Sequence, residues 1–327
     1  MIIRAIKSRE MILCGALGLL IGLIALQFPA FIAPSNLADT FNDTSPLIIL
    51  ALGQMIVILT RCIDLSVAAN LALTGMLVAM INTQFPTLPI AVLIVIAVTA
   101  GTLMGAINGL LTWKLDIPPI VVTLGTMTIY RGLIFLLSEG QWINAHEMSD
   151  SFKALPRTEL LHLPVLSWAA ILTTLAFIVL VTRTPLGRAF YAVGGNPNAA
   201  VYAGIDVGRT RFMAFTLCGA LAGLTGYLWV SRYAVAYVDI AGGFELDVIA
   251  ACVIGGISIA GGVGTVAGAF LGAIFLGVIK NALPVIGISP FAQLAISGAA
   301  IILAVTFSAR SNHKKGRLIL KPEEPAG

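Results

Sequence analysis

Charged residues are scarce in this chain of 327 residues, of which only 10% are Asp, Glu, Lys or Arg and 58% are hydrophobic. Soluble domains carry about 25% charged residues, so a chain of this composition cannot cover its surface with charge. Lipid is the simplest medium for the remaining surface. We attribute the net charge of +4 to Lys and Arg held on the cytoplasmic side, and we predict no nucleic-acid partner.

Cysteine and histidine are also few. The cysteines Cys14, Cys62, Cys218 and Cys252 are scattered in or next to apolar runs, without the paired spacing of a zinc site or a disulfide framework. The three histidines lie far apart and outside the apolar runs. The chain also lacks the GxxxxGK[ST] sequence of a P-loop. We therefore predict no metal, no cofactor and no ATP site in this chain.

Acidic residues are missing from the middle of the apolar runs. Asp64 and Asp116 are expected at cytoplasmic turns, and Glu245 and Asp247 at the start of a span. Intramembrane carboxylates are the usual sign of proton coupling, so their absence argues against a proton-driven carrier. The driving energy is then expected from another polypeptide. No nucleophile, base and metal group assembles either, so we predict a translocation protein and not an enzyme.

Ten apolar runs have the character of membrane spans, which need about 20 mostly apolar residues. They cover residues 11–28, 47–60, 66–82, 89–113, 117–138, 164–182, 210–233, 244–258, 264–283 and 290–308. The second and eighth are short, so we expect their ends to lie in protein-lined space. We take the first as an uncleaved span, because no small-residue cleavage site follows it. The prediction is an all-α membrane fold in a single domain, residues 1–327.

The direction of the spans follows from the distribution of Lys and Arg. Most of the 19 such residues fall on the side that holds both termini, which is therefore the cytoplasmic side. This places a long loop, residues 139–163, outside and another, residues 183–211, in the cytoplasm. The tail, residues 309–327, is predicted to be a mobile basic segment near the membrane.

Glycines at intervals of four mark two predicted helix faces, because that spacing puts them on one side of a helix. They are Gly101, Gly105 and Gly109 on the fourth span and Gly264, Gly268 and Gly272 on the ninth, with a shorter pair, Gly219 and Gly223, on the seventh. Small residues let two backbones approach closely. Both static packing and a sliding helix pair are compatible with this pattern.

An internal echo links two segments that begin at Ile58 and Val253. Each reads as the end of a short span, a tight turn and a small-residue helix that runs back. Two related helical halves, as in many transporters, would explain it, and so would convergence on glycine-rich membrane composition.

The cytoplasmic loop has the clearest local signals. Pro185 and Gly187 are expected to end the sixth span, and Gly194 starts a break. Asn196 is a good N-cap before Pro197 at the first helical position, and Gly204 is suited to close a helix of one or two turns. Because so short a helix is marginal in water, we interpret it as a knob that fits a groove on a cytoplasmic partner.

Four motifs in order then show a resemblance over nearly the whole length. They are GQMIVILTRCIDLSVAANLALTG (53–75), NGLLTWKLDIPPIVVTLGTMTIYRG (108–132), the loop 184–211 and ELDVIAACVIGGISIAGGVGTVAGAFLG (245–272). The chain resembles the ribose-type sugar permeases of bacterial ABC importers. The first motif of that family often reads Gly-Gly-Ile-Asp-Leu-Ser-Val-Gly, whereas Arg61, Cys62 and Ala68 stand at the variable places here. These departures, with the stretch from Gly140 to Trp142, look more like the rhamnose and autoinducer-2 branches.

The resemblance implies partners and a location. Two permeases, as a homodimer or with a sister subunit, would form a pore in the bacterial inner membrane, above cytoplasmic ABC ATPases and below a periplasmic sugar-binding protein. It also implies that the short cytoplasmic helix couples the permease to the ATPase. The coupling residues would be Gly195, Asn196, Pro197, Asn198, Ala199, Ala200, Gly204 and Ile205.

A neutral monosaccharide or deoxysugar is the expected solute, and polar span residues are candidates for contacting its hydroxyls. They are Asn70, Asn108, Thr123, Tyr130 and Arg131. For the first four the alternative is an interhelical hydrogen bond, worth roughly 0.6 kcal/mol. For Arg131 the alternatives are snorkelling to the outer interface or pairing with Glu139. Two other functions stay open: a branched-chain amino-acid permease, which would need charge on its path, and a self-sufficient carrier or channel.

Overall fold

The computed structural model describes residues 9–285 and five isolated positions after them, 289, 292, 295, 298 and 299. Apart from the two-residue antiparallel strands β1 (Glu159–Leu160) and β2 (Leu163–Pro164), the regular structure is helical. The predicted all-α class is confirmed.

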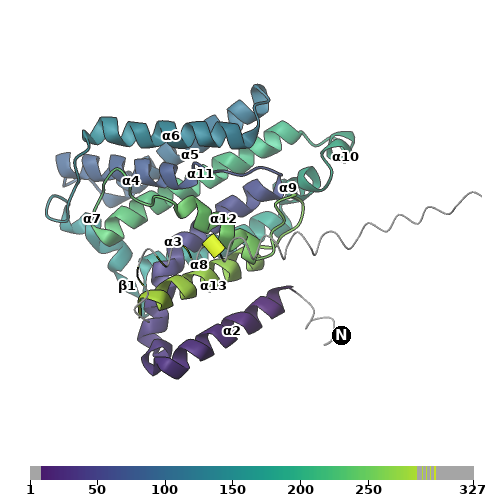
Figure 1. The fold of residues 1–327 in the computed structure, drawn as a ribbon. Helices are drawn as coiled ribbons and strands as arrows, with labels where there is room; N and C mark the ends of the chain where they lie inside the picture. Colours follow the sequence, from purple (N-terminus) through teal and green to yellow (C-terminus); the bar gives the residue numbers. More distant parts are fainter. Residues whose placement is uncertain (1–8, 286–288, 290–291, 293–294, 296–297, 300–327) are drawn as a thin grey trace, which may run out of the picture.

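Eight helices of the described part are long and apolar enough to cross a membrane. They are α2 (Arg9–Gln27), α3 (Pro34–Leu59), α4 (Val67–Gln84), α5 (Ile90–Lys114), α6 (Pro119–Ser138), α8 (Val165–Arg183), α11 (Val207–Tyr233) and α13 (Val266–Val285). The shorter elements are η1 (Pro29–Ile32), α7 (Asp150–Ala154), η2 (Leu155–Arg157), α9 (Pro185–Gly195), α10 (Pro197–Tyr202) and α12 (Phe244–Ile254). In Figure 1 the long helices lie roughly side by side, with α7 and β1 at one end of the bundle and α9 and α10 at the other.

Two predicted spans need correction. The second is not short, because α3 has 26 residues and starts at Pro34. The prediction missed its first half because that half is polar and is followed by an internal proline, Pro46, so a hydropathy pattern does not indicate a continuous helix there. The eighth, α12, has only 11 residues. At 1.5 Å per residue that is about 16 Å, roughly half of the hydrocarbon core. The tenth predicted span, the basic tail and both termini lie outside the continuously described residues.

The core is centred on α3 and α11. Every residue of α3 from Thr44 to Leu59 is buried, and α11 packs against α3, α4 and α5. Helix α2 lies below the other helices in Figure 1 and meets the bundle at α13, where Leu17 and Ile21 pack on Val278 and Ala282.

The predicted glycine face of the fourth span is an observed helix contact. Gly101 and Gly105 of α5 face Gly219 and Gly223 of α11 so closely that a Cβ on any of them would meet backbone atoms of the other helix. On the ninth span, Gly268 and Gly272 face α12 in the same way, against Gly255 and Ala251. The prediction is wrong for Gly264, which precedes α13 and lies in the turn after α12.

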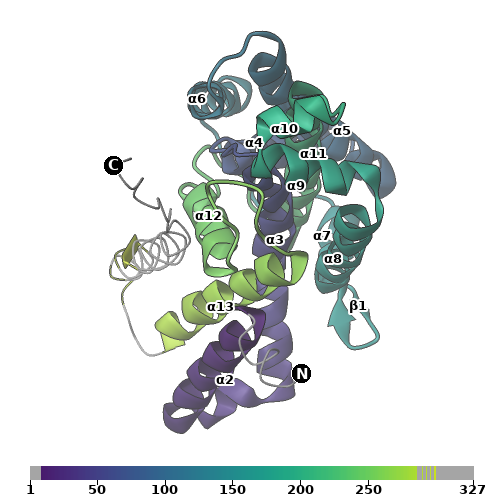
Figure 2. The ribbon, with the colours of Figure 1, turned by 90° about the vertical axis from the view of Figure 1, so that its right-hand side faces the viewer.

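The two echo segments meet at one end of the bundle. Each consists of a helix, a turn and a returning helix: α3 to α4 across residues 60–66, and α12 to α13 across residues 255–265. Gly262 N donates to Leu59 O at 3.0 Å, so the two turns lie side by side. This is also the end that carries α9 and α10, which face the viewer in Figure 2. The relation of the two halves stays a prediction.

Candidate functional site

Helix α10 forms as its sequence predicts. The Asn196 side chain accepts a hydrogen bond from Ala199 N at 3.1 Å, and Pro197 occupies the first helical position. The chain leaves the helix through Gly204 at φ +78°, and Ile205 N returns to Ala200 O at 2.9 Å. A left-handed backbone favours glycine, so the cap and the closing residue fix both ends of α10.

The segment before α10 differs in part from expectation. The sixth span, α8, ends at Arg183 just before Pro185, as predicted, because the residue before a proline avoids the helical conformation. Pro185 and Gly187 also begin a separate helix, α9, whose N-cap Thr184 accepts from Gly187 N at 3.0 Å. Proline is well placed at a first helical turn. Gly194 lies inside α9 and not in a break, and Gly195 is its last residue.

Arg61 ties the turn between α3 and α4 to the base of α10. Its Nε donates to Gly194 O at 2.7 Å and its Nη2 donates to Gly195 O at 2.8 Å. Gly194 also lies so close to Leu59 O and Gly262 N that a Cβ there would meet both atoms. The α9–α10 segment is thus held by both echo turns, a contact that the sequence analysis did not anticipate.

The exposed surface of α10 carries two large side chains that the sequence analysis did not single out. Tyr202 is 93% exposed and Val201 is 59% exposed, whereas Ala200 faces inward. Large side chains exposed at the tip of a short helix have an unfavourable solvation free energy. Packing against the described part of this chain does not offset it. Tyrosine is enriched where proteins bind one another strongly, so this tip has the chemistry of a docking knob.

The predicted path residues on the spans are buried and hydrogen-bonded within the chain. Asn70 donates to Gly101 O at 3.1 Å, Asn108 to Ser66 Oγ at 2.8 Å, Thr123 to Pro119 O at 3.0 Å and Tyr130 to Met104 O at 2.9 Å. These bonds join α4, α5 and α6 around one interface, apart from the bond of Thr123 to Pro119 O within α6. Thr123 also donates to Ile63 O at 3.3 Å, in the turn between α3 and α4. The Oδ1 atoms of Asn70 and Asn108 are buried without a hydrogen-bond partner among the residues that the structure describes. In this conformation Asn70, Asn108 and Tyr130 hold helices together.

Arg131 lies elsewhere, against the loop between α11 and α12. Its Nη1 donates to Val238 O at 3.1 Å and to Ile240 O at 2.7 Å. These two carbonyls, and not the predicted alternative partner Glu139, accept the hydrogen bonds of the guanidinium. Arg131 therefore holds the loop between α11 and α12 on α6.

Asp64, in the turn between α3 and α4, is a buried carboxylate that the sequence analysis placed correctly but did not expect to be buried. It is 2% exposed, and its Oδ1 accepts from Ser66 N at 2.9 Å and from Ser66 Oγ at 2.7 Å. Burial raises the pKa of Asp64 to about 6, although the bonds from Ser66 lower it. Through Ser66 and Asn108 the carboxylate is linked to α5.

The raised pKa predicts a pH-dependent effect of Asp64→Asn. Because the folded-state pKa lies above the ordinary value, the folded protein loses stability as the pH rises from about 4 to about 6, by roughly 3 kcal/mol in total. Asparagine still accepts from Ser66 and carries no charge. Thermal melting in detergent should therefore favour the variant over the wild type more at about pH 7.5 than at about pH 4.5. An equal difference at both pH values would contradict this.

Comparisons with known proteins agree with the membrane architecture. A family model described as "Branched-chain amino acid transport system / permease component" matches residues 36–305. The chain is 37% identical to the autoinducer 2 import system permease protein LsrC of Enterobacter sp. (strain 638), over 93% of this chain and 88% of that protein. It is 36% identical to the ribose import permease protein RbsC of Bacillus subtilis (88% of each chain) and 36% to that of Escherichia coli K12 (89% and 90%). No solved structure matches.

Proposed function

This chain belongs to the family of transport-system permease components, and we propose that it forms half of the pore of an ATP-driven importer for a monosaccharide or deoxysugar. It is a multi-pass protein of the bacterial cell membrane and a translocation subunit. In the proposal, separate cytoplasmic ATPase subunits hydrolyse ATP, a periplasmic binding protein delivers the solute, and a second permease copy or a sister permease completes the pore.

The observation that carries the coupling role is helix α10. It lies at one end of the bundle (Figure 1), capped by Asn196 and closed by Gly204, with Tyr202 almost fully exposed. Arg61 and the close contacts of Gly194 connect it to the turns on which α3, α4, α12 and α13 converge. When a partner displaces α10, these contacts would therefore transmit the displacement directly to the four membrane helices.

The substrate class rests on the relatives, whose names state ribose and autoinducer 2, while the description of the family states branched-chain amino acids. An amino-acid zwitterion needs opposite charges on its path. Among the predicted path residues only Arg131 is charged, and its guanidinium is bonded to two carbonyls. The scarcity of charged side chains among the predicted path residues therefore favours a neutral solute. Uptake of leucine, and not of ribose or rhamnose, by the complete complex would reverse this choice.

Tyr202→Ala should uncouple the chain from its ATPase. Removing an aromatic anchor from an interface commonly costs about 2 kcal/mol or more, so the affinity between this chain and its ATPase should fall about thirtyfold or more. ATP hydrolysis stimulated by the loaded binding protein should fall with it. The measurement uses the complete complex in proteoliposomes. Leu160→Ala, which truncates an exposed residue of the external loop, is the matched control. Wild-type stimulation of a folded Tyr202→Ala complex would refute the docking role of α10.

A self-sufficient carrier is separated from this proposal by reconstituting the chain alone. Solute uptake without an ATPase would support the carrier and overturn the importer.

A further inference from the structure

A cavity of about 460 Å³ opens at the end of the molecule opposite α10. It lies where η1 and the first turns of α3 meet the end of α13, and the predicted topology places this end outside the cell. Its volume is within the range of about 300–1,000 Å³ that is typical of small-molecule sites. The sequence analysis did not foresee it, because it forms only where residues 27–43 meet Asn281, which lies far away in the chain.

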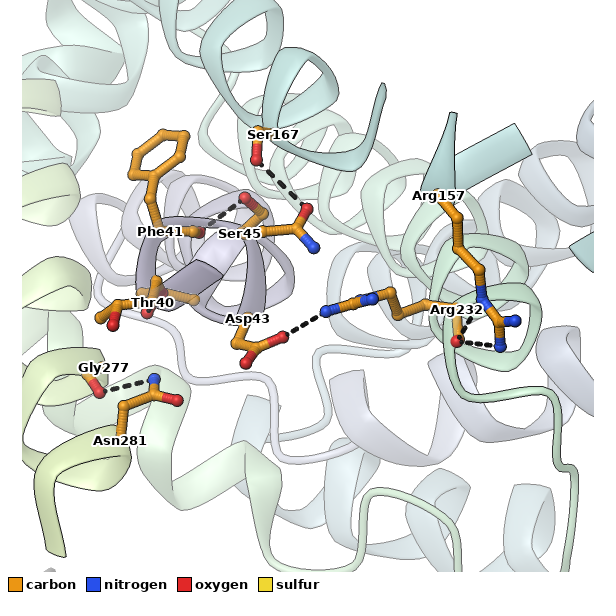
Figure 3. Close-up of polar contacts among 11 residues, drawn as sticks. Thr40, Phe41, Asp43, Ser45, Arg157, Ser167, Arg232, Gly277 and Asn281 are labelled. Carbon is orange, nitrogen blue, oxygen red and sulfur yellow. Dashed lines mark hydrogen bonds and ion pairs between the residues drawn. The ribbon is translucent and has the colours of Figure 1, made fainter. Parts of the chain in front are cut away.

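The polar lining has free hydrogen-bonding capacity. Thr40 is only 9% exposed, yet its hydroxyl makes no hydrogen bond to the part of the chain that is described. Asn281 donates to Gly277 O at 3.0 Å and leaves its own side-chain oxygen free toward other described residues. Figure 3 shows Thr40 and Asp43 on α3 and Asn281 on α13 beside one another. A hydroxyl that lines the cavity and makes no bond to the described chain can both donate to and accept from a ligand there, so this arrangement is suited to a ligand that carries hydroxyl groups.

An ion pair fixes the charge of one wall. Asp43 binds Arg232 of α11 at 2.8 Å, and the Arg232 carbonyl accepts from Arg157 Nη2 at 2.7 Å (Figure 3). The negative charge of Asp43 is thereby compensated by Arg232. Asp39 adds a carboxyl group with no ion-pair partner among the described residues. Such a lining repels anions, and its carboxylate oxygens accept hydrogen bonds from hydroxyl groups.

Apart from Gln27 and Asn36, the remaining lining is apolar. Phe28 and Phe31 line the cavity beside the polar groups. Nearby, α13 closes on α3 where Gly277 contacts Thr44 so tightly that no side chain would fit. An apolar enclosure with a few convergent polar groups is the general form of a small-molecule site.

We propose that this cavity is an external subsite for a neutral, polyhydroxylated solute of monosaccharide size. Thr40, Asp39 and Asn281 would bind hydroxyl groups, and the phenylalanines would cover the C–H face. The proposal rests on the importer function. In it, this cavity is the first site at which the solute binds the permease. A solute bound here would contact α3 and α13 directly, and the ion pair between Asp43 and Arg232 would link it to α11.

Cysteine protection tests occupancy. Thr40→Cys is placed in a Cys14→Ala background, since Cys14 is exposed and the other three cysteines are buried. The complete complex in proteoliposomes is treated from outside with a membrane-impermeant methanethiosulfonate, with and without D-ribose or L-rhamnose. One sugar should slow modification about threefold or more, as expected when a ligand occupies most of its sites. Ser151→Cys, on the external helix α7, should react equally fast in all conditions.

The outcomes separate this subsite from the importer function. A cysteine at position 40 that does not react, that neither sugar protects, or that calcium chloride protects in place of sugar overturns the subsite. If the wild-type complex then still imports either sugar with ATP, the importer function stands alone. Thr40→Val gives a second measurement: uptake at low binding-protein concentration should fall about threefold. Unchanged uptake would also overturn the subsite.

Discussion

Replacing Gly105 with leucine is expected to prevent stable folding. A Cβ at this position would lie 2.9 Å from Gly219 Cα and 3.1 Å from Gly219 N, and closer still to Phe215 O. Overpacking costs about 1–3 kcal/mol where side chains can yield. Here the neighbours are backbone atoms of α11, so the cost should exceed about 3 kcal/mol, a large part of a native stability of about 5–15 kcal/mol. The detergent-solubilised variant should lose its monodisperse elution peak or melt far below the wild type.

Gly125→Leu is the matched control. Gly125 lies on α6, and a Cβ there would meet nothing within 4 Å. Leucine is also the better helix former by nearly 1 kcal/mol, so this variant should express and melt like the wild type. A Gly105→Leu protein as stable as Gly125→Leu would mean that α5 and α11 are not in the close contact described.

Local signals predicted some elements well. The sequence from Asn196 to Gly204 contains its own N-cap, its proline and its closing glycine, so α10 could be predicted without tertiary information. The glycines of α5 were equally informative, because a spacing of four defines a face, although the sequence could not say that α11 is the partner. Periodicity identifies a face, and only the fold identifies its neighbour.

Other features were hidden because tertiary contacts override local signals. The first half of α3 is too polar to be predicted as a span, yet it continues one helix and forms a wall of the cavity near Asn281. Gly264 fits the interval of four but precedes α13. Arg61 stands where the resembling family often has glycine, and φ +65° at this position explains that preference. What the arginine adds became visible only through its bonds to α9.

The contact between Gly194 of α9 and the two echo turns, which we call the junction, should tolerate added volume as poorly as the α5–α11 contact does. The property expected to be lost here is coupling to the ATPase. In Gly194→Val, a side chain would be forced against Leu59 O and Gly262 N, which are backbone atoms of both echo turns. The α9–α10 segment must then move away from the membrane helices. ATP hydrolysis stimulated by the loaded binding protein should fall more than about tenfold, because a small misplacement of an assembled site can cost that much. The measurement uses the complete complex in proteoliposomes.

Two further variants keep this prediction testable if Gly194→Val folds poorly. Arg61→Ala removes the bonds to Gly194 O and Gly195 O without adding volume, and it should lower stimulated hydrolysis in the same direction but less. Arg61→Gly also relieves the left-handed backbone, worth about 1 kcal/mol, so it should melt higher than Arg61→Ala and yet couple equally poorly. Arg188→Ala, which removes an exposed arginine of α9, is the control. If coupling followed melting temperature across these variants, the junction would act through stability alone. If stimulated hydrolysis stayed at the wild-type level in all of them, force would not pass from α10 through this junction.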